Sequence, residues 1–291
     1  MAQSSRNIRV VCPDGFRLAG TLYEPKATKA AVLMAPATGI KRGFYHAFSS
    51  YLASHGFGVL AFENRGIGES CNLTLDEGNP SLVSWGQLDM TAALDELIRQ
   101  FPEQSYHLVG HSAGGQLFGL MQNAPQFSSV FNFACSSGSL QGIEYPFKLQ
   151  AWFFLKIYIP FCNAVFGHTK SQWVGMGEPL PKQVAAEWSR WCLGTGYVKN
   201  ELGNLTMEHY YETLAIPTLW IHASDDPIAN SKNVEDMISV FPNLLVERRC
   251  LKPADWGYRN IGHMKFFSSK RKELWTLALD LSLIHIPSPR D

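Results

Sequence analysis

The turn around Ser112 constrains the fold of this chain more than any other stretch. Gly110 and Gly114 flank the serine, between a short apolar strand predicted at 105–110 and an apolar run of helical spacing at 114–121. A serine on so sharp a strand-to-helix turn projects its hydroxyl beyond the end of the sheet. Glycines are required there because larger neighbouring side chains would clash in the bend. Gly-x-Ser-x-Gly is a short pattern, but this setting favours a nucleophilic serine over an ordinary glycine-rich turn.

The hydrophobic pattern of the rest of the chain predicts an α/β protein. Apolar or alternating stretches predict strands at 7–11, 16–23, 30–35, 58–62, 105–110, 129–135, 217–222 and 245–250, and helical spacing occurs at 44–55, 85–99, 114–121, 233–241 and within 265–283. The first two strands should form a hairpin. The alternation that follows predicts a mostly parallel central sheet with helices on both faces and the strand carboxyl ends along one edge.

The alternation stops between the strands at 129–135 and 217–222. We therefore divide the chain into core residues 1–139, a helical cap or lid insertion at 140–214, and core residues 215–283. No clear strand is expected in the insertion, whereas helices are expected at 184–192 and 208–214. Residues 284–291 fit no element and are treated as a disordered or non-native tail.

Residues 145–166 of the insertion are dense in aromatic side chains. We expect most of them to pack the lid onto the core and some to line a substrate pocket. Lys148, Lys156 and Pro160 argue against a membrane-spanning helix, and Pro160 should end or kink a helix. Membrane contact is not expected, and contact with a lipid surface is the weaker alternative.

Composition excludes several classes of protein. The 291 residues are 46% hydrophobic and 17% charged with a formal net charge of zero, and they contain no long basic run, so no nucleic-acid partner is expected. The six cysteines form no CxxC pair, which predicts no metal site and a reducing compartment. The polar start of the chain favours a cytoplasmic location. The sequence does not predict the oligomeric state.

A serine nucleophile needs a histidine base and a carboxylate behind the base. After such a turn, the acid and the histidine follow the serine in chain order. Of nine histidines, His263 alone lies in a glycine-containing loop between the last strand and the last helix, whereas His111 should point away from the site. Asp226, which precedes a proline and an apolar residue, is the preferred acid. Asp225 is the alternative and should otherwise cap its own loop.

Two backbone N–H groups should hold the oxyanion. Ala113 follows the nucleophile and is the first expected donor. Ala37 is the second, because small residues follow the strand at 30–35 and would let a carbonyl approach the backbone. Arg65 is expected to anchor neighbouring loop carbonyls rather than to act in catalysis.

The chain resembles the α/β-hydrolase superfamily over nearly its whole length. The motifs that carry the resemblance are residues 64–70 (NRGIGES), 110–115 (GHSAGG), 223–227 (ASDDP) and 262–263 (GH). Residues 187–192 (EWSRWC) and 261–267 (IGHMKFF) are similar to bacterial predicted hydrolases near the serine-aminopeptidase-like and monoglyceride-lipase-like branch. Two positions depart from the family pattern: Ala35-Pro36 replaces His-Gly at the oxyanion loop, and Glu63-Asn64 stands where an aspartate is usual.

The resemblance implies the α/β-hydrolase fold and a mechanism class, but no substrate. We expect a serine hydrolase that cleaves a carboxylic ester with a hydrophobic acyl or alcohol group through an acyl-enzyme. Amide or peptide hydrolysis and acyl transfer would use the same triad, and a non-catalytic binding protein of this fold is a further alternative. No metal or organic cofactor is implied.

Overall fold

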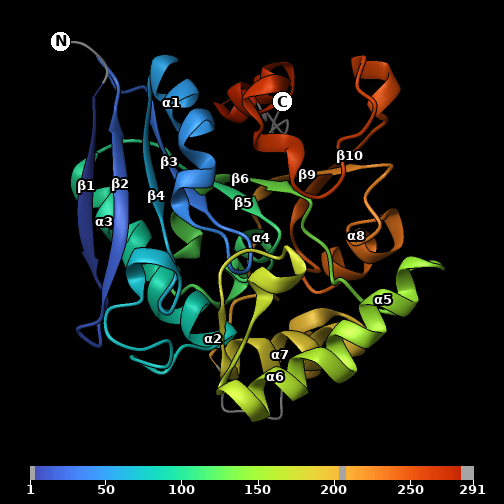
Figure 1. Ribbon diagram of the computed structural model, residues 1–291. Helices are drawn as coiled ribbons and strands as arrows, with labels where there is room; N and C mark the ends of the chain where they lie inside the picture. The colour runs from blue at the N-terminus through green and yellow to red at the C-terminus, as the bar shows by residue number, and fades with distance from the viewer. Residues whose placement is uncertain (1–3, 203–207, 283–291) are drawn as a thin grey trace.

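An eight-stranded sheet forms the centre of the molecule (Figure 1). The computed structural model describes residues 4–202 and 208–282. In spatial order the strands are β1 (Ser4–Val11), β2 (Arg17–Glu24), β4 (Phe57–Phe62), β3 (Ala30–Ala35), β5 (Tyr106–His111), β6 (Phe127–Phe133), β9 (Pro217–Ala223) and β10 (Leu245–Leu251). Strand β2 runs antiparallel to β1 and β4, and all other neighbouring pairs are parallel. The predicted α/β class with a mostly parallel sheet is therefore confirmed.

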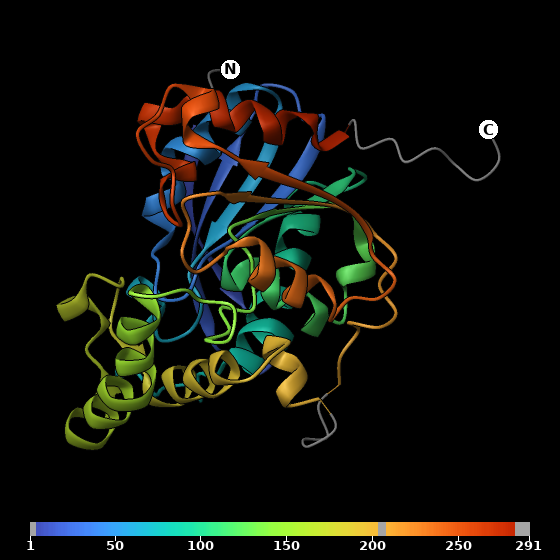
Figure 2. The same ribbon diagram turned by 90° about the vertical axis from the view of Figure 1, so that its right-hand side faces the viewer.

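Helices cover both faces of the sheet because its central strands are apolar on both sides. Every residue of β3 and β4 is buried. One face is covered by α1 (His46–Ser54), preceded by the 3-10 turn η1 (Arg42–Tyr45), and by the 3-10 segments η10 (Lys265–Phe267) and η11 (Ser269–Ser282). The other face carries α3 (Thr91–Gln100), α4 (Ala113–Gln116) and α8 (Ser231–Ile238) (Figure 2).

Two core helices differ from the sequence prediction. The helix expected at 85–99 begins earlier, with α2 (Leu82–Ser84) and the π-helical η3 (Trp85–Met90) before α3, because the Ser81 hydroxyl caps it by accepting the Ser84 N–H at 2.8 Å. The helix expected at 114–121 is broken into α4 and the 3-10 turn η4 (Phe118–Leu120). Glycine is a poor helix former, and three of the seven residues from Ala113 to Gly119 are glycines.

The segment between β6 and β9 lies at one end of the molecule, at the bottom of Figure 1. Its helices are α5 (Phe147–Phe153), the π-helical η6 (Phe154–Tyr158), α6 (Ile159–Phe166) and α7 (Lys182–Leu193). Contrary to the prediction, it also contains two short paired strands, β7 (His168–Thr169) and β8 (Leu180–Pro181). The helix expected at 208–214 is a turn instead. We call residues 140–214 the lid; the domain boundaries themselves stay a prediction, and residues 284–291 lie outside the described part.

Pro160, which was predicted to end or kink a helix, does not end its helix. α5, η6 and α6 form one 20-residue helix, Phe147–Phe166, with Pro160 in the first turn of α6 after the π-helical stretch. Pro160 has no N–H to donate to a carbonyl of the preceding turn, and the π-helical stretch lies directly before it. This helix is long and apolar enough to cross a membrane, but some core helices of soluble proteins meet the same two criteria. Of its most apolar 18-residue stretch, 28% is buried.

Contrary to the expectation, most aromatic side chains of residues 145–166 do not pack onto the core. Tyr145, Phe153 and Phe161 are 78%, 53% and 58% exposed. The buried face of the helix is formed instead by smaller side chains, namely Leu155, Ile159 and Cys162.

The lid is attached to the core beside the loop that follows β3. The Glu178 N–H donates to the Gly39 carbonyl at 2.8 Å, and the Glu178 carboxylate pairs with Lys41 at 2.8 Å. Further along, the buried Glu187 of α7 accepts the N–H of Leu82 at 2.7 Å, which joins the lid to the start of α2. These contacts position the lid over the carboxyl edge of the sheet.

Candidate active site

Ser112 lies at the junction of β5 and α4 in a strained backbone conformation. Its φ and ψ are 49° and −113°, in a region that a residue with a side chain rarely adopts. Its N–H donates to the Phe133 carbonyl at 3.0 Å, which holds the turn against the end of β6. Strain maintained in this way at one serine is typical of a nucleophile elbow.

The glycines around Ser112 are required by close packing. A Cβ atom on Gly114 would lie 2.2 Å from the Ala35 carbonyl oxygen at the end of β3. One on Gly115 would lie 2.2 Å from Asn132 Oδ1, and one on Gly110 would lie 2.6 Å from the Gly115 backbone. The positive φ is taken by the serine itself, and the glycines provide the space that lets its turn pack between β3 and β6.

His263 and Asp226 form a close pair at the same edge of the sheet. Nδ1 of His263 lies 2.8 Å from Oδ2 of Asp226, whose side chain is fully buried, whereas that of His263 is 16% exposed. The other oxygen of Asp226 accepts the N–H groups of Ile228 and Ala229 at 2.9 and 3.0 Å. Burial alone would raise the pKa of Asp226, but His263 and these hydrogen bonds hold that pKa below its usual value. An ionised Asp226 accepts a hydrogen bond from Nδ1 of His263 and leaves Nε2 free to accept a proton.

Asp225 points to a different target from its neighbour. Its two oxygens accept the N–H groups of Ile261 and Gly262, at 2.9 and 3.0 Å. It therefore holds the loop that carries His263, rather than capping its own loop as the sequence predicts. The Asx-type contacts within that loop belong to Asp226.

The expected serine and histidine are not joined by a hydrogen bond in this structure. Within residues 4–202 and 208–282, the Ser112 hydroxyl has no hydrogen-bond contact with His263. The loops are connected through their neighbours: Nε2 of His111, next to the serine, lies 3.0 Å from the His263 carbonyl oxygen. A serine–histidine hydrogen bond often tightens only once substrate is bound.

The N–H of Ala37, the expected second oxyanion donor, is engaged by a side chain of the protein itself. This N–H donates to the hydroxyl oxygen of Tyr45 at 2.9 Å. The prediction of Ala37 as second donor therefore does not fit this structure, because its only N–H is occupied by a tyrosine that is completely buried behind the loop. Ala113 lies where it was expected, at the first position of α4 directly after Ser112.

The same tyrosine starts a directed chain of hydrogen bonds. Tyr45 Oη lies 2.9 Å from Nδ1 of His111, whose Nε2 faces the His263 carbonyl. A carbonyl can only accept, so Nε2 of His111 carries the proton. Burial and the nearby His263 lower the pKa of His111 to about 3, so its ring is neutral and Nδ1 accepts from Tyr45. Ala37, Tyr45, His111 and the backbone of His263 thus form one series of donors and acceptors.

Sequence reasoning missed Tyr45 and the linking role of His111. His111 was expected to point away from the site, whereas its Nε2 lies 3.0 Å from the His263 carbonyl oxygen. Its position beside Ser112 was the only available signal in the sequence. Tyr45 belongs to no motif, and only the folded chain brings it beside Ala37.

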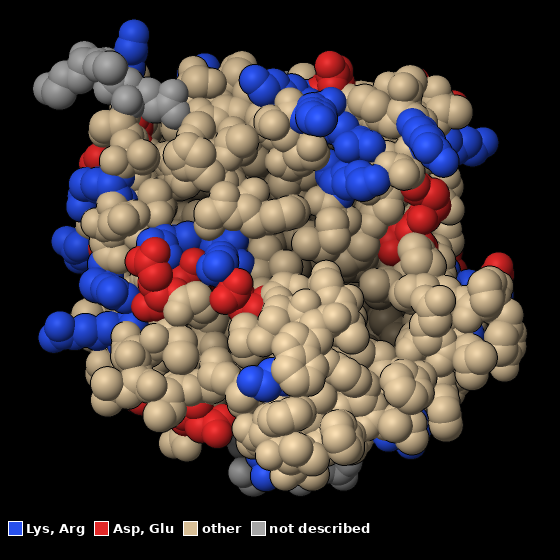
Figure 3. All heavy atoms as spheres, in the orientation of Figure 1, with Lys and Arg blue, Asp and Glu red and all other residues tan. Residues whose placement is uncertain are grey.

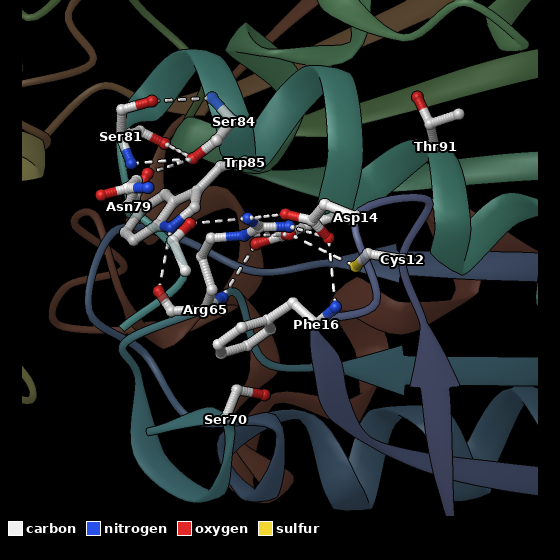
Figure 4. A network of polar contacts seen from close by, with 12 residues as sticks. Cys12, Asp14, Phe16, Arg65, Ser70, Asn79, Ser81, Ser84, Trp85 and Thr91 are labelled. Atoms are coloured by element: carbon white, nitrogen blue, oxygen red, sulfur yellow. Dashed lines mark hydrogen bonds and ion pairs between the residues drawn. The ribbon is translucent and has the colours of Figure 1, made fainter. Parts of the chain in front are cut away.

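Arg65 anchors loops outside the triad, as expected from the sequence. Its guanidinium binds Asp89 at 2.7 Å, Asp14 at 2.6 Å and the Gly78 carbonyl at 2.7 Å (Figure 4). The Trp85 indole donates to the Arg65 carbonyl at 3.1 Å. This network holds the loop after β4 against the turn between β1 and β2 and against the helix at Trp85.

No metal centre is evident in the part of the chain that the structure describes. Residues 4–202 and 208–282 contain no group of three or more His, Cys, Asp or Glu side chains arranged to hold a metal ion. The candidate site is formed by the serine turn, the Asp226–His263 pair and the N–H of Ala113.

A mostly parallel sheet with a strained serine after β5, and an aspartate and a histidine after β9 and β10, defines an α/β-hydrolase. The comparison with protein families agrees. Residues 21–173, slightly more than half of the chain, match the Hydrolase_4 family, described as Serine aminopeptidase, S33, and the chain belongs to this family. The comparison with curated proteins found no matching sequence.

Solved structures share the fold at low sequence identity. A thermostable carboxyl esterase from Bacillus coagulans is 14% identical with a TM-score of 0.63, and the match covers 97% of this chain and 98% of that one. An esterase from Pyrococcus furiosus is 14% identical with a TM-score of 0.61, covering 96% and 90%. An acylaminoacyl peptidase from Pyrococcus horikoshii is 15% identical with a TM-score of 0.56, covering 97% of this chain and 41% of that one. These similarities establish a fold shared with hydrolases of more than one specificity.

Proposed function

We propose that this hydrolase cleaves carboxylic esters through an acyl-enzyme on Ser112. The observation that carries the proposal is the Asp226–His263 pair at 2.8 Å, on a loop linked through His111 to the strained serine turn. A buried carboxylate behind a histidine ring is the arrangement that activates a serine. The expectation of no cofactor stays part of the proposal.

In the acylation step, Nε2 of His263 takes the Ser112 proton while Oγ bonds to the substrate carbonyl carbon. The carbonyl oxygen becomes an oxyanion that the Ala113 N–H stabilises. When the tetrahedral intermediate collapses, the bond to the alcohol oxygen breaks, and His263 gives its proton to the departing alcohol.

Deacylation repeats these steps with water. His263 takes a proton from the water as the water oxygen bonds to the acyl carbon. The bond to Ser112 then breaks, the carboxylic acid leaves, and the proton returns to Oγ. Asp226 stays ionised and stabilises the imidazolium in both halves of the reaction.

An ester with a hydrophobic acyl or alcohol group is the substrate that we favour. The lid next to the site is rich in apolar side chains, and two of the similar structures are named esterases. Amide or peptide hydrolysis is the second candidate, favoured by the family description and by the similarity to an acylaminoacyl peptidase.

The mechanism is tested with Ser112→Ala. We expect ester hydrolysis to fall ~10⁴-fold or more, and labelling by a fluorophosphonate probe to disappear, because the nucleophile is lost. Ser54→Ala, which changes an exposed serine on α1, is the matched control and should keep both. Retention of the rate and of labelling by Ser112→Ala protein would refute the mechanism.

Substrate class is tested separately. Rates on nitrophenyl esters of increasing acyl length are compared with rates on aminoacyl nitroanilides. Faster turnover of the longer esters supports our preference, and faster turnover of the anilides supports the second candidate. Absence of both turnover and labelling in the unaltered protein would instead indicate a non-catalytic binding protein.

A further inference from the structure

The long lid helix Phe147–Phe166 is apolar on both of its faces. Its inner face is buried, and a stripe of apolar residues with a spacing of four faces outward: Leu149, Phe153, Ile157, Phe161 and Val165. These five side chains are between 45% and 62% exposed. Residues four apart share one side of a helix, so the stripe is continuous. A helix that is apolar all round is normally covered on all sides.

Neighbouring side chains widen this stripe into a patch. Trp152 and Phe166 lie on the same helix and are 44% and 38% exposed. Trp173 and Val174, in the turn that follows β7, are 63% and 45% exposed. Figure 3 shows the result as a broad surface over the lid with few charged side chains, in contrast to the body above it. We call these nine side chains the lid patch. Its continuity exceeds the scattered apolar exposure of ordinary surfaces.

Polar contacts attach the inner face of the helix to the rest of the lid. The Asn163 side chain donates to the Lys182 carbonyl at 3.0 Å and accepts from the Thr169 hydroxyl at 2.9 Å. The Ser189 hydroxyl of α7 donates to the Leu155 carbonyl at 2.8 Å. The helix therefore lies flat on the protein, and its outer face alone is available to a partner.

Between Glu144 and Glu178, the segment that carries the patch has charged side chains of one sign. Residues 145–177 contain Lys148, Lys156 and Lys170 and no aspartate or glutamate. The Lys170 ammonium lies 5.3 Å from the centre of the Phe166 ring and 5.6 Å from that of Trp173, at the border of the apolar surface. Lysines beside exposed aromatic side chains are typical of helices that lie in a membrane interface.

The position of Lys156 argues against a second copy of the chain as the partner. This exposed lysine is at the middle of the 20-residue helix. In a two-fold dimer formed by antiparallel packing of this face, the two Lys156 side chains would meet, and like charges would repel each other.

From the apolar stripe and its basic border, we propose that the lid patch docks on the surface of a lipid bilayer that contains anionic lipids. The apolar side chains enter the acyl boundary, and the lysines contact the lipid phosphates. This proposal takes up the weaker alternative of the sequence analysis, contact with a lipid surface, in place of the expectation of no membrane contact. The contact is peripheral and does not depend on ester hydrolysis.

The experiment is vesicle flotation of the full chain. We compare vesicles of phosphatidylcholine with vesicles that also contain phosphatidylglycerol, and we expect stronger binding to the second. The double variant Phe153→Ser/Phe161→Ser should bind at least about tenfold more weakly, because two large apolar contacts are lost. Lys148→Gln/Lys156→Gln should weaken binding to the anionic vesicles by about fivefold per lysine and leave binding to the phosphatidylcholine vesicles unchanged.

The matched control is Val11→Ser/Leu73→Ser. These residues are 61% and 87% exposed but lie on the core, so binding should not change. Far-UV circular dichroism and hydrolysis of a short soluble ester verify that the lid variants are folded. Ser112→Ala protein should bind vesicles normally, which separates this proposal from the proposed function.

Three outcomes would overturn the proposal. The first is no binding of the unaltered chain to either kind of vesicle. The second is equal binding of the phenylalanine variant and the control. The third is a concentration-dependent dimer in sedimentation that Phe153→Ser/Phe161→Ser abolishes, because this would assign the patch to a second copy of the chain.

Discussion

Two adjacent carboxylates, Asp225 and Asp226, both position His263, but only Asp226 contacts it directly. Asp226 contacts the ring at Nδ1, and Asp225 contacts the backbone N–H groups of Ile261 and Gly262 just before it. The sequence could restrict the acid to these two residues and favoured Asp226. It could not predict that Asp225 reaches across 36 residues, since that contact depends on the loop geometry after β9 and β10.

We predict different effects of neutralising these carboxylates. Asp226→Asn should lower kcat for ester hydrolysis by about 10⁴-fold, because an amide can donate to Nδ1 and stabilise the wrong tautomer. Asp225→Asn keeps an oxygen acceptor for one backbone N–H and should lower kcat by less than about tenfold. Steady-state kinetics on one ester compares the pair. Equal kcat values for the two variants would mean that neither residue orients His263 in the proposed way.

At the scale of elements, three segments far apart in sequence are joined behind the site. Tyr45 ends η1, His111 ends β5, and the loop of His263 follows β10. The chain of hydrogen bonds through Tyr45 and His111 also occupies the Ala37 N–H. It couples the loop after β3 to the histidine loop, so the position of one depends on the other.

Removing the Tyr45 hydroxyl should therefore destabilise the fold. Tyr45→Phe leaves the Ala37 N–H and Nδ1 of His111 buried without their partner, and we expect the free energy of unfolding to fall by about 1–3 kcal/mol. Urea denaturation provides the measurement. Tyr210→Phe, which removes a hydroxyl with a weak 3.4 Å contact to Glu208, should change it by less than about 0.5 kcal/mol. Similar values for the two variants would show that the chain through Tyr45 contributes nothing to stability.

The elements themselves were largely predictable. The apolar runs of β3 and β4 and the turn at Ser112 carry their signal locally, and their predicted and observed limits agree within about two residues. The lid was less predictable. Paired strands of two residues, β7 and β8, are too short for any period to be visible, and the continuous helix through Pro160 depends on a π-helical register that the sequence does not reveal.

At the scale of the whole molecule, core stability depends on histidines that must stay neutral when buried. Burial lowers the pKa of His107, in the central strand β5, to about 4. In the unfolded chain its pKa would be about 6.5. Between these values the unfolded chain binds a proton that the folded protein does not, so the contribution of His107 to stability falls as the pH falls below about 6.5.

We predict that His107→Asn weakens this dependence. On lowering the pH from about 7.5 to about 5, the unaltered protein should lose about 2 kcal/mol more unfolding free energy than the variant. His107 contacts Ser129 at 2.8 Å and belongs to no part of the proposed triad, so the change in slope is separable from activity. Denaturant unfolding at both pH values gives the difference. Parallel pH profiles for the two proteins would contradict a buried neutral His107.

The expected cytoplasmic location and reducing compartment stay predictions. All six cysteines are free in the structure. The distribution of charge adds to the sequence information at this scale. A net charge of zero conceals one segment of the lid, residues 145–177, whose only charged side chains are three lysines. Figure 3 shows the broad uncharged surface on this face of the molecule.

The sequence by itself determined the sheet, the serine turn and the order of serine, acid and histidine along the chain. These features depend on period, glycine position and spacing, all of which are local in the chain. Only the tertiary structure decided which aspartate meets the histidine ring, where the Ala37 N–H points and which face of the lid helix is exposed. These are contacts between residues distant in sequence, made at ångström separations, and a linear pattern contains no information on direction in space.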